Sequence, residues 1–365
     1  MIYVQHLLGI GHLKRMSLLA DGLAGAGAKV LLVTGGMPAP HVMPSGAVEV
    51  LQLPPLRTAD ENFSGLIDAE GNPADDATRQ RRTALLTEAV TTFAPEILVV
   101  ELFPLGRRQM RFELVPLLDA ARPVCQRIAC SVRDIVNRRP HREEEALGWL
   151  NRWFDILLVH GDEMLTPIRD SVPTIGTFTG RVIHTGYLGD APIAAAERGS
   201  EILVSAGGGA SGEKLFRAAA GASALLAGDH GWRIRHGRDA DTSTIGELRR
   251  AAGPDCIIEP VASDFRQRLA RAALSVSQFG YNTAMDIVQT ATPAIVAPFE
   301  GGGETEQLRR AEAFAGQGIR LLRESELSAP GLAAAVAEML SDTAPSRRPI
   351  DVNGLDRSVR TLLQA

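Results

Sequence analysis

Short apolar runs alternate with longer amphipathic segments along most of the chain. In the first half the apolar runs occupy residues 1–7, 29–35, 48–53, 96–102, 124–132, 155–161 and 181–187. A second series occupies 201–207, 232–237, 256–261, 274–279, 293–299 and 319–324, with helical patterns such as 213–228 and 305–318 between the runs. Repeated strand–helix–strand units require parallel pairing, because a parallel neighbour needs a crossover connection. The pattern therefore predicts α/β architecture with two doubly wound parallel sheets.

A break between the two series predicts where the domains divide. Residues 188–200, LGDAPIAAAERGS, are small and polar enough to form a hinge near residue 190. We predict a first domain at 1–190, a second at 191–345, and a C-terminal tail at 346–365 that could pack back on the first domain. A length of 365 residues suits two domains. The polar stretch 57–80 is predicted to be a loop.

Composition narrows the class of partner. A formal charge of −5 with 22% charged residues offers no basic surface for nucleic acid phosphates. Cys125, Cys130 and Cys256 lack CxxC spacing, so neither a disulfide framework nor a thiolate zinc site is indicated. The first residues do not resemble a signal peptide, and no apolar run approaches the roughly 20 residues of a membrane-spanning helix. We expect a cytoplasmic protein that acts on small molecules.

The first of three glycine-containing strand exits is HLLGIGHLKR, residues 6–15. Gly9 and Gly11 allow a sharp turn and a close approach of the backbone to a ligand. Lys14 stands where a dinucleotide fingerprint has its third glycine, which argues against NAD. His12, at the start of the next helix, could act as a general base because its imidazole is neutral near pH 7. Alternatively, His12 only satisfies a nearby carbonyl.

The second exit is SAGGGASGEK, residues 205–214. Gly207, Gly209 and Gly212 formally match GxGxxG, but this match alone is weak. A P-loop is excluded because Glu213 follows Gly212. The stretch offers backbone N–H groups before a helix, which attract phosphate whichever nucleotide carries it. Its alternative is a simple turn.

The third exit, residues 275–318, is the most informative segment. Gly280 and Asn282 suit a tight turn, and Thr283 with Asp286 has the spacing of a capping box. Alternatively, Asp286 accepts the two hydroxyls of a ribose whose diphosphate lies at the helix N-terminus. Glu304 and Glu306 could balance the dipole of their helix, with Arg309 and Arg310 as ion-pair partners one turn later. Alternatively, Glu306 and Gln307 could bind the hydroxyls of a sugar.

Residues 275–318 resemble the nucleotide-sugar-binding motif of GT-B glycosyltransferases, specifically family 28, which includes the N-acetylglucosaminyltransferase of peptidoglycan synthesis. The loop with Gly9, Gly11, His12 and Arg15 is similar to the N-terminal loop of that family. The resemblance implies a GT-B fold, with two Rossmann-like domains facing a central cleft. It implies that His12 faces the acceptor, and that the donor is contacted by Gly280, Asn282 and Thr283 at the diphosphate, Asp286 at the ribose, and Glu306 with Gln307 at the sugar. The loop with Gly207, Gly208 and Gly209 falls where the second domain of that family begins, and its backbone N–H groups are expected to add to the diphosphate site. UDP is the expected nucleotide, with thymidine and guanosine diphosphates left open, and Phe265 is expected near the base.

Charged residues at other strand ends of the first domain could line an acceptor pocket, although such residues are more often solvated or paired. The sequence also departs from the family, because Thr185, Gly186 and Tyr187 are followed by Gly189 and Asp190 where the peptidoglycan enzyme has a basic residue. Arg238 or backbone amides would then neutralise the diphosphate. The candidate acceptor residues are Glu101, Arg107, Arg108, Arg133, Asp134, His160 and Asp162.

The expected function is transfer of a hexose-type sugar from a nucleoside diphosphate-sugar, as UDP-sugar, to a hydroxyl acceptor with inversion. Fixed N–H dipoles would stabilise the leaving diphosphate, so neither a metal nor a cofactor is expected. Asp239 and Asp241 resemble a metal-binding DxD and are read as a loop. Two alternatives stay open: a nucleotide-sugar hydrolase or epimerase, and a non-catalytic nucleotide-sugar-binding protein. The acceptor, peripheral membrane contact and the oligomeric state also stay open.

Overall fold

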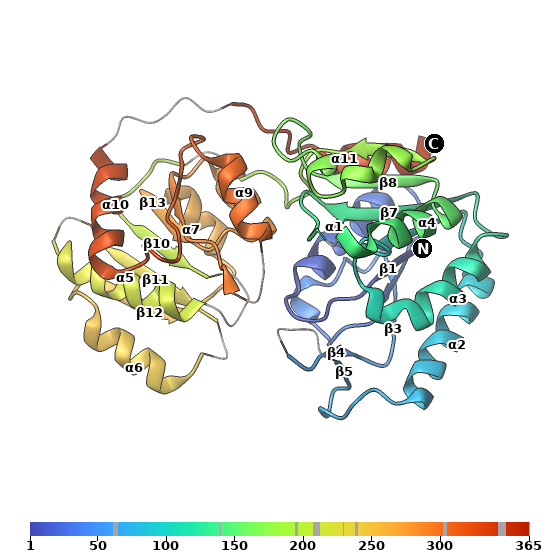
Figure 1. The fold of residues 1–365 in the computed structure, drawn as a ribbon. Coiled ribbons are helices and arrows are strands. Elements are labelled where there is room, and N and C mark those ends of the chain that lie inside the picture. Colours follow the sequence, from blue (N-terminus) through green and yellow to red (C-terminus); the bar gives the residue numbers. More distant parts are fainter. Residues whose placement is uncertain are drawn as a thin grey trace. The chain divides into compact units, whose positions relative to one another are not determined.

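A computed structural model of the chain describes residues 1–60, 65–138, 140–193, 196–206, 212–228, 230–237, 240–301, 305–341 and 348–364. The chain divides into two compact units, Met1–Gly189 with the segment from Asp351 onward, and Asp190–Ile350 (Figure 1). The first crossing between the units lies in the segment expected to be a hinge. The tail was predicted to start at residue 346, and the chain returns to the first unit at Asp351.

The first unit is built on a seven-stranded parallel sheet in the order β3-β2-β1-β6-β7-β8-β9. Six of the seven strands lie within the apolar runs of the sequence, and β7 extends one residue past its run, to Arg133, which confirms the predicted strands. The strands are β1 (Ile2–Val4), β2 (Leu31–Thr34), β3 (Glu49–Gln52), β6 (Ile97–Glu101), β7 (Arg127–Arg133), β8 (Ile156–His160) and β9 (Arg181–His184). The helices are α1 (Gly11–Gly25), α2 (Asp76–Phe93), α3 (Arg111–Ala121), α4 (Glu143–Trp153) and α11 (Gly354–Gln364).

Both faces of this sheet are buried, which explains why its strands read as nearly continuous apolar runs. Tyr3 packs into the core that contains α2, α3 and α4 residues, whereas its neighbours Ile2 and Val4 point to the other core, with α1 and α11. The alternation follows from the two-residue period of a strand. Helix α11 packs on α1 so closely that a Cβ at Gly22 would lie 2.7 Å from Leu355 Cδ1.

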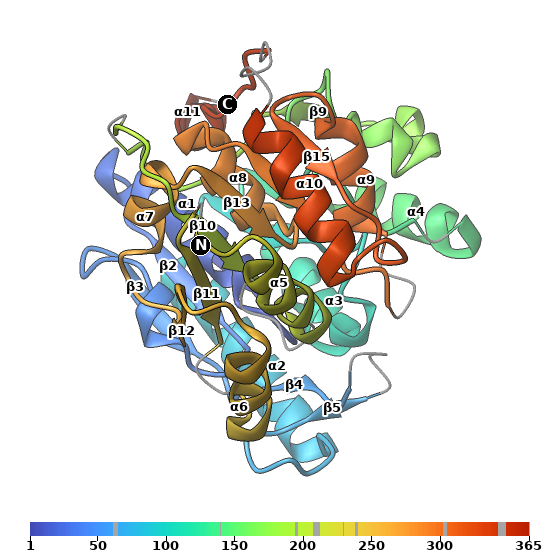
Figure 2. The ribbon, with the colours of Figure 1, turned by 90° about the vertical axis from the view of Figure 1, so that its left-hand side faces the viewer.

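The second unit is a six-stranded parallel sheet in the order β12-β11-β10-β13-β14-β15. Helices α5 and α10 lie side by side and share one apolar core with the sheet (Figure 2). The strands are β10 (Ile202–Ser205), β11 (Trp232–His236), β12 (Cys256–Pro260), β13 (Leu274–Ser277), β14 (Ala294–Val296) and β15 (Ile319–Leu321). The helices are α5 (Glu213–Leu225), α6 (Thr242–Ala251), α7 (Phe265–Arg271), α8 (Tyr281–Thr290), α9 (Glu306–Phe314) and α10 (Ala329–Ser341). These six strands confirm the second apolar series.

One local prediction was wrong, and one of the alternatives for Asp286 is excluded. The stretch 57–80 contains a small antiparallel pair, β4 (Arg57–Thr58) with β5 (Leu66–Ile67), and the first turn of α2. Asp75 caps that turn by accepting a hydrogen bond from the N–H of Thr78 at 2.7 Å. The capping box at Thr283 is absent because α8 begins at Tyr281, with Gly280 as its N-cap.

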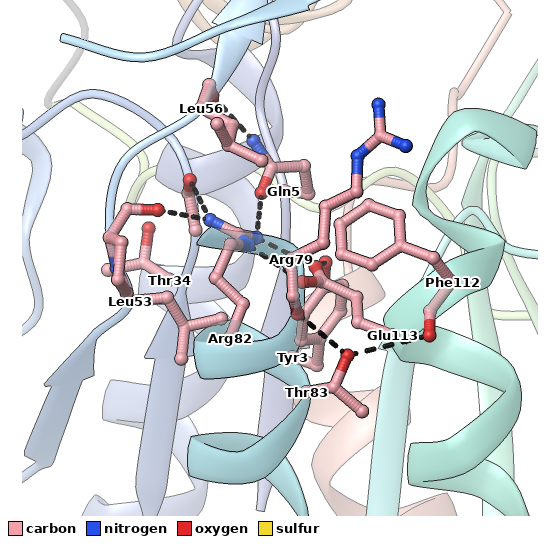
Figure 3. A network of polar contacts seen from close by, with 12 residues as sticks. Tyr3, Gln5, Thr34, Leu53, Leu56, Arg79, Arg82, Thr83, Phe112 and Glu113 are labelled. Atoms are coloured by element: carbon pink, nitrogen blue, oxygen red, sulfur yellow. Dashed lines mark hydrogen bonds and ion pairs between the residues drawn. The ribbon is translucent and has the colours of Figure 1, made fainter. Parts of the chain in front are cut away.

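A buried ion pair ties α2 and α3 to the sheet (Figure 3). Arg82 of α2 donates from Nε and one terminal nitrogen to the two carboxylate oxygens of Glu113 on α3, both at 2.7 Å. Arg82 also donates to Gln5 Oε1 and to the Gly35 carbonyl, while the Tyr3 hydroxyl donates to Glu113. Both charged side chains are fully buried. The pair therefore fixes the ends of β1 and β2, where the loops of the candidate site begin.

Candidate active site

The order of the first sheet brings the β1 and β6 exits together. Strand β1 has β2 on one side and β6 on the other, so the strand order reverses between β1 and β6. The connections that follow β1 and β6 both start at this point. Ligands of doubly wound sheets bind at such switch points, outside the carboxyl ends of the strands. His12 lies in the first turn of α1, directly after β1, and Glu101 is the last residue of β6. Residues 89 positions apart thereby become neighbours.

His12, Glu101 and Arg15 form a compact cluster at this switch point. His12 Nδ1 lies 2.6 Å from Glu101 Oε1, and a terminal nitrogen of Arg15 donates to the same oxygen at 2.6 Å. Glu101 is fully buried, Arg15 is 2% exposed and the His12 side chain is 13% exposed. Arg15 lies one helical turn after His12, so both side chains reach the carboxylate from the same face of α1.

Burial keeps the ring of His12 neutral. Burial lowers the pKa of His12 to about 3; Arg107 and Arg133 add to this effect, and Glu101 opposes it. Burial raises the pKa of Glu101, but His12, Arg15 and Arg107 outweigh it and bring the value to about 2. Glu101 is therefore ionised and accepts the Nδ1 proton of His12. We assign the tautomer in which Nε2 of His12 is a proton acceptor.

Other acceptor-side predictions have different outcomes. Arg133, the last residue of β7, is partly buried and its charge acts on His12. A Cβ at Gly9 would meet no atom within 4 Å, so the described protein gives no steric reason for glycine there. Arg108 is paired with Glu145 at 3.0 Å.

His160 and Asp162 are both bonded within the protein, and their assignment to an acceptor pocket stays a prediction. His160 is fully buried, with Nε2 2.8 Å from Ser131 Oγ and Nδ1 3.0 Å from Thr185 Oγ1. Burial lowers the pKa of His160 to about 3. Asp162 accepts hydrogen bonds from the backbone N–H groups of Met164 and of Asp351 in the C-terminal segment. Sequence alone could not separate these side chains from Glu101, since all three lie at the carboxyl ends of strands.

In the second unit, the N-terminus of α8 has the form expected for an anion site. Gly280 is the N-cap and no side chain caps the helix. Asn282 and Thr283 lie in the first turn, where the backbone N–H groups have no intrahelical acceptor. Strand β13 ends just before this terminus and lies beside β10, which marks the switch point of the second sheet. The two features together match a site for a phosphate group.

Asp286 is held by an arginine that the sequence analysis did not select. Arg266 Nε lies 2.8 Å from Asp286 Oδ1, and the same guanidinium bonds to Gln289 Oε1 and the Ala191 carbonyl. Asp286 is 8% exposed. Arg266 directly follows Phe265 at the start of α7, and its ion pair depends on the packing of α7 against α8. No local pattern signals that pairing.

Glu306 and Gln307 both bond to the protein. Glu306 is 3% exposed and accepts a hydrogen bond from Arg310 at 2.6 Å, as expected for partners one helical turn apart. Gln307 Oε1 accepts from the backbone N–H groups of Phe279 and Phe299. These contacts connect α9 to the exits of β13 and β14.

Several candidates lie outside the described residues: Gly207, Gly208, Gly209, Arg238, Asp239 and Glu304. Asp241, from the DxD-like pair, is the N-cap of α6 and accepts from the N–H groups of Ser243 and Thr244. In the described part of the chain, no three His, Cys, Asp or Glu side chains are grouped so as to hold a metal ion. The helices that the structure describes include none long and apolar enough to cross a membrane.

Comparison with known proteins identifies a family domain in the second unit. Residues 202–350 match the glycosyltransferase family 28 C-terminal domain. A Rhodospirillum centenum UDP-N-acetylglucosamine--N-acetylmuramyl-(pentapeptide) pyrophosphoryl-undecaprenol N-acetylglucosamine transferase is 27% identical over 174 residues, 46% of this chain and 46% of that protein. The chain spans less than half the length of the curated relatives it matches.

Solved structures show the same fold over the whole chain. The crystal structure of MurG from Acinetobacter baumannii has a TM-score of 0.63 at 14% identity, covering 100% of this chain and 99% of that one. UGT2 of Phytolacca americana, complexed with UDP-2-fluoroglucose and pterostilbene, has a TM-score of 0.62 at 15% identity, covering 100% and 93%. Residues 202–350 therefore match the family 28 C-terminal domain, and the chain as a whole has the two-sheet fold of the GT-B glycosyltransferases.

Proposed function

We propose that this protein moves a hexose-type sugar from a nucleoside diphosphate-sugar to a hydroxyl acceptor, with inversion and without a metal ion or cofactor. A UDP-sugar is the proposed donor, because the name of the Rhodospirillum centenum relative contains UDP-N-acetylglucosamine and the Phytolacca americana structure holds a UDP-sugar. The observation that carries the proposal is a neutral histidine bonded to a buried carboxylate at the first sheet's switch point, in a chain whose second unit is a family 28 domain.

His12 is the proposed base. The acceptor hydroxyl gives its proton to His12 Nε2 while its oxygen bonds to the anomeric carbon of the donor. The bond from that carbon to the diphosphate oxygen breaks, and its electron pair leaves with the nucleoside diphosphate. Glu101 orients the ring through the 2.6 Å contact with Nδ1 and stabilises the imidazolium that forms. Attack opposite the leaving group inverts the anomeric centre.

The donor is proposed to bind at the β13–α8 exit of the second unit. Backbone amides at Gly280, Asn282 and Thr283 would receive the diphosphate, since fixed dipoles stabilise developing charge without reorganisation. Asp286 would accept the ribose hydroxyls, with Arg266 fixing the carboxylate through their 2.8 Å ion pair. Gly207, Gly208 and Gly209 are proposed to contribute to the same diphosphate site, and Phe265 to lie near the base.

Glu306 and Gln307 are proposed to contact the sugar. Both now bond to the protein, so contact with a sugar requires Glu306 to share its carboxylate with Arg310, or Gln307 to turn its amide nitrogen toward the ligand. A carboxylate has two oxygens and can hold both partners.

The donor assignment can be tested by thermal shift against a panel of UDP-, dTDP- and GDP-sugars. A ligand at 100 times its Kd stabilises the fold by about 2.7 kcal/mol, which raises the melting temperature. Asp286→Asn should abolish the shift. Asp264→Asn is the matched control, because Asp264 pairs with Arg268 on the same unit and should leave the shift intact. A response to NAD alone would overturn the donor assignment.

The role of His12 is tested by activity and binding together. His12→Gln should lower transfer about 10²–10⁴-fold while the shift with donor persists. Full activity in this variant would exclude His12 as the base. Release of free sugar without acceptor, at the same rate as with acceptor, would identify a hydrolase instead.

A further inference from the structure

The segment after β6 positions an arginine beside the proposed base, and the proposed chemistry does not use it. Arg107 precedes a short 3₁₀ turn, Arg108–Met110, and has φ of +57°. Leu102, five residues earlier, has φ of +66°. Residues other than Gly, Asn and Asp seldom adopt this left-handed region. Two such residues in one segment indicate that the fold holds the backbone in place, as often occurs at functional sites.

Packing explains how this backbone is held. Phe103 is fully buried and stacks on Trp149 at 5.3 Å between ring centroids. A Cβ at Gly106 would lie 2.7 Å from the Leu102 side chain, so a larger residue there would force that side chain to move. Met110, just after Arg107, is also fully buried. The Arg107 side chain therefore projects from a rigid segment.

The surroundings of Arg107 are rich in positive charge. Its guanidinium acts electrostatically on His12, Glu101 and Tyr3, which places it among the first sheet's carboxyl-end groups. Burial lowers the pKa of Arg107; Arg133 and Arg15 contribute to the lowering, and Glu101 opposes it. Glu101 Oε1 is shared by His12 and Arg15, and Glu101 Oε2 has no hydrogen-bond partner among the described residues, so Glu101 does not satisfy Arg107 Nε. Among the described residues, the buried Nε of Arg107 has no hydrogen-bond partner.

A buried guanidinium N–H without an acceptor is costly, and it is satisfied best by an oxyanion that accepts two parallel hydrogen bonds. We propose that Arg107 binds an oxyanion of the acceptor, a carboxylate or a phosphate monoester, beside the hydroxyl that His12 deprotonates. This inference rests on the proposed function and names the chemical class of the acceptor.

Such binding would also activate the base. The positive charges of Arg107 and Arg133 disfavour a proton on His12, and Glu101 favours one. The remaining charged group is Arg15, which contacts both the His12 ring and Glu101. An acceptor anion on Arg107 offsets one of the opposing charges and raises the pKa of His12. A base with a pKa closer to the working pH accepts a proton more readily. His12 would thus become an effective base only when the acceptor is in place.

Oxyanion binding can be measured without donor or turnover. The histidine Cε1–H signals of wild-type protein are followed by NMR against pH with benzoate, with inorganic phosphate, and with neither, and His12→Gln assigns the signal. We expect one or both anions to raise the pKa of His12 in the wild type and not in Arg107→Gln. Arg107→Lys should keep part of the effect. Arg108→Gln is the matched control, because Arg108 is paired with Glu145, and should behave as wild type. No anion effect in wild type, or equal loss in both Gln variants, overturns the proposal.

Turnover gives a second readout once a donor is known. 4-(Hydroxymethyl)benzoate, its neutral carboxamide and 4-(hydroxymethyl)phenyl phosphate are compared as acceptors, so that the carboxylate and phosphate sources are separated. Arg107→Gln should lower kcat/KM about ten- to a hundredfold for the preferred anionic acceptor, and leave the carboxamide unchanged or faster. An equal fall for charged and neutral acceptors overturns the anion site. If donor binding fails in the thermal-shift test while anions still act on His12, the proposed function fails and the anion site stands.

Discussion

Replacing Glu113 by Gln tests whether the buried pair in Figure 3 holds the first unit together. Glu113 receives two hydrogen bonds from Arg82 and one from Tyr3, and Arg82 and Glu113 are fully buried. An amide keeps one acceptor but turns an NH₂ group toward the guanidinium or the Tyr3 hydroxyl. The Arg82 charge is then left buried and uncompensated. Removing one partner of a buried pair costs about 3–5 kcal/mol, a large part of the roughly 5–15 kcal/mol that stabilises a typical domain.

Urea unfolding followed by tryptophan fluorescence can assign this loss to one unit. The chain has three tryptophans; Trp149 and Trp153 lie on α4 of the first unit, and Trp232 lies on β11 of the second. In a Trp232→Phe background the signal reports only the first unit. We expect Glu113→Gln to lower the unfolding free energy of that unit by about 3–5 kcal/mol.

A double replacement separates lost attraction from uncompensated charge. Arg82→Met with Glu113→Leu removes both charges and refills the space with apolar groups. Such replacements of buried pairs are often nearly neutral, so the double variant should be more stable than Glu113→Gln alone. A loss below about 1 kcal/mol in Glu113→Gln, the value typical of an exposed pair, would refute the reasoning. A double variant that is less stable than the single one would refute it as well.

Three further predictions concern pH, the C-terminal segment and the second unit. The pKa of His160 falls from 6.5 to about 3 on folding, so keeping this ring neutral costs free energy of unfolding as the pH falls below 6.5. In urea titrations, His160→Gln should reduce the loss of unfolding free energy between pH 6.5 and 5.0 by about 2 kcal/mol. Gly186 has φ of +82° and its Cβ would lie 2.6 Å from a carboxylate of the C-terminal segment; Gly186→Ala should cost about 1–3 kcal/mol and expose that segment to proteolysis, whereas Gly148→Ala, in an exposed part of α4, should stabilise. Arg310→Met leaves Glu306 buried without its ion-pair partner and should cost the second unit about 3–5 kcal/mol, seen in the second unit's tryptophan signal and contradicted by an unchanged midpoint.

The sequence by itself determined the strands of both parallel sheets. All thirteen apolar runs contain strands of the two parallel sheets, because a strand buried on both faces must be apolar along its length. The glycine exits before α1 and α8, and the position of His12 in the first turn of α1, follow from local patterns of the same kind. Periods of two and 3.6 residues are properties of neighbouring residues, so they can be read without knowing the fold.

Only the tertiary structure decided which charged side chains meet. Glu101 and His160 both end apolar strands, yet the strand order places Glu101 beside His12 and buries His160 against Ser131. Likewise, the packing of α7 beside α8 joins Arg266 to Asp286. The energy of an ion pair depends on distance and burial, which strand order and helix packing set between residues far apart in the chain. A local pattern carries no record of that order, so it could nominate these residues but could not pair them.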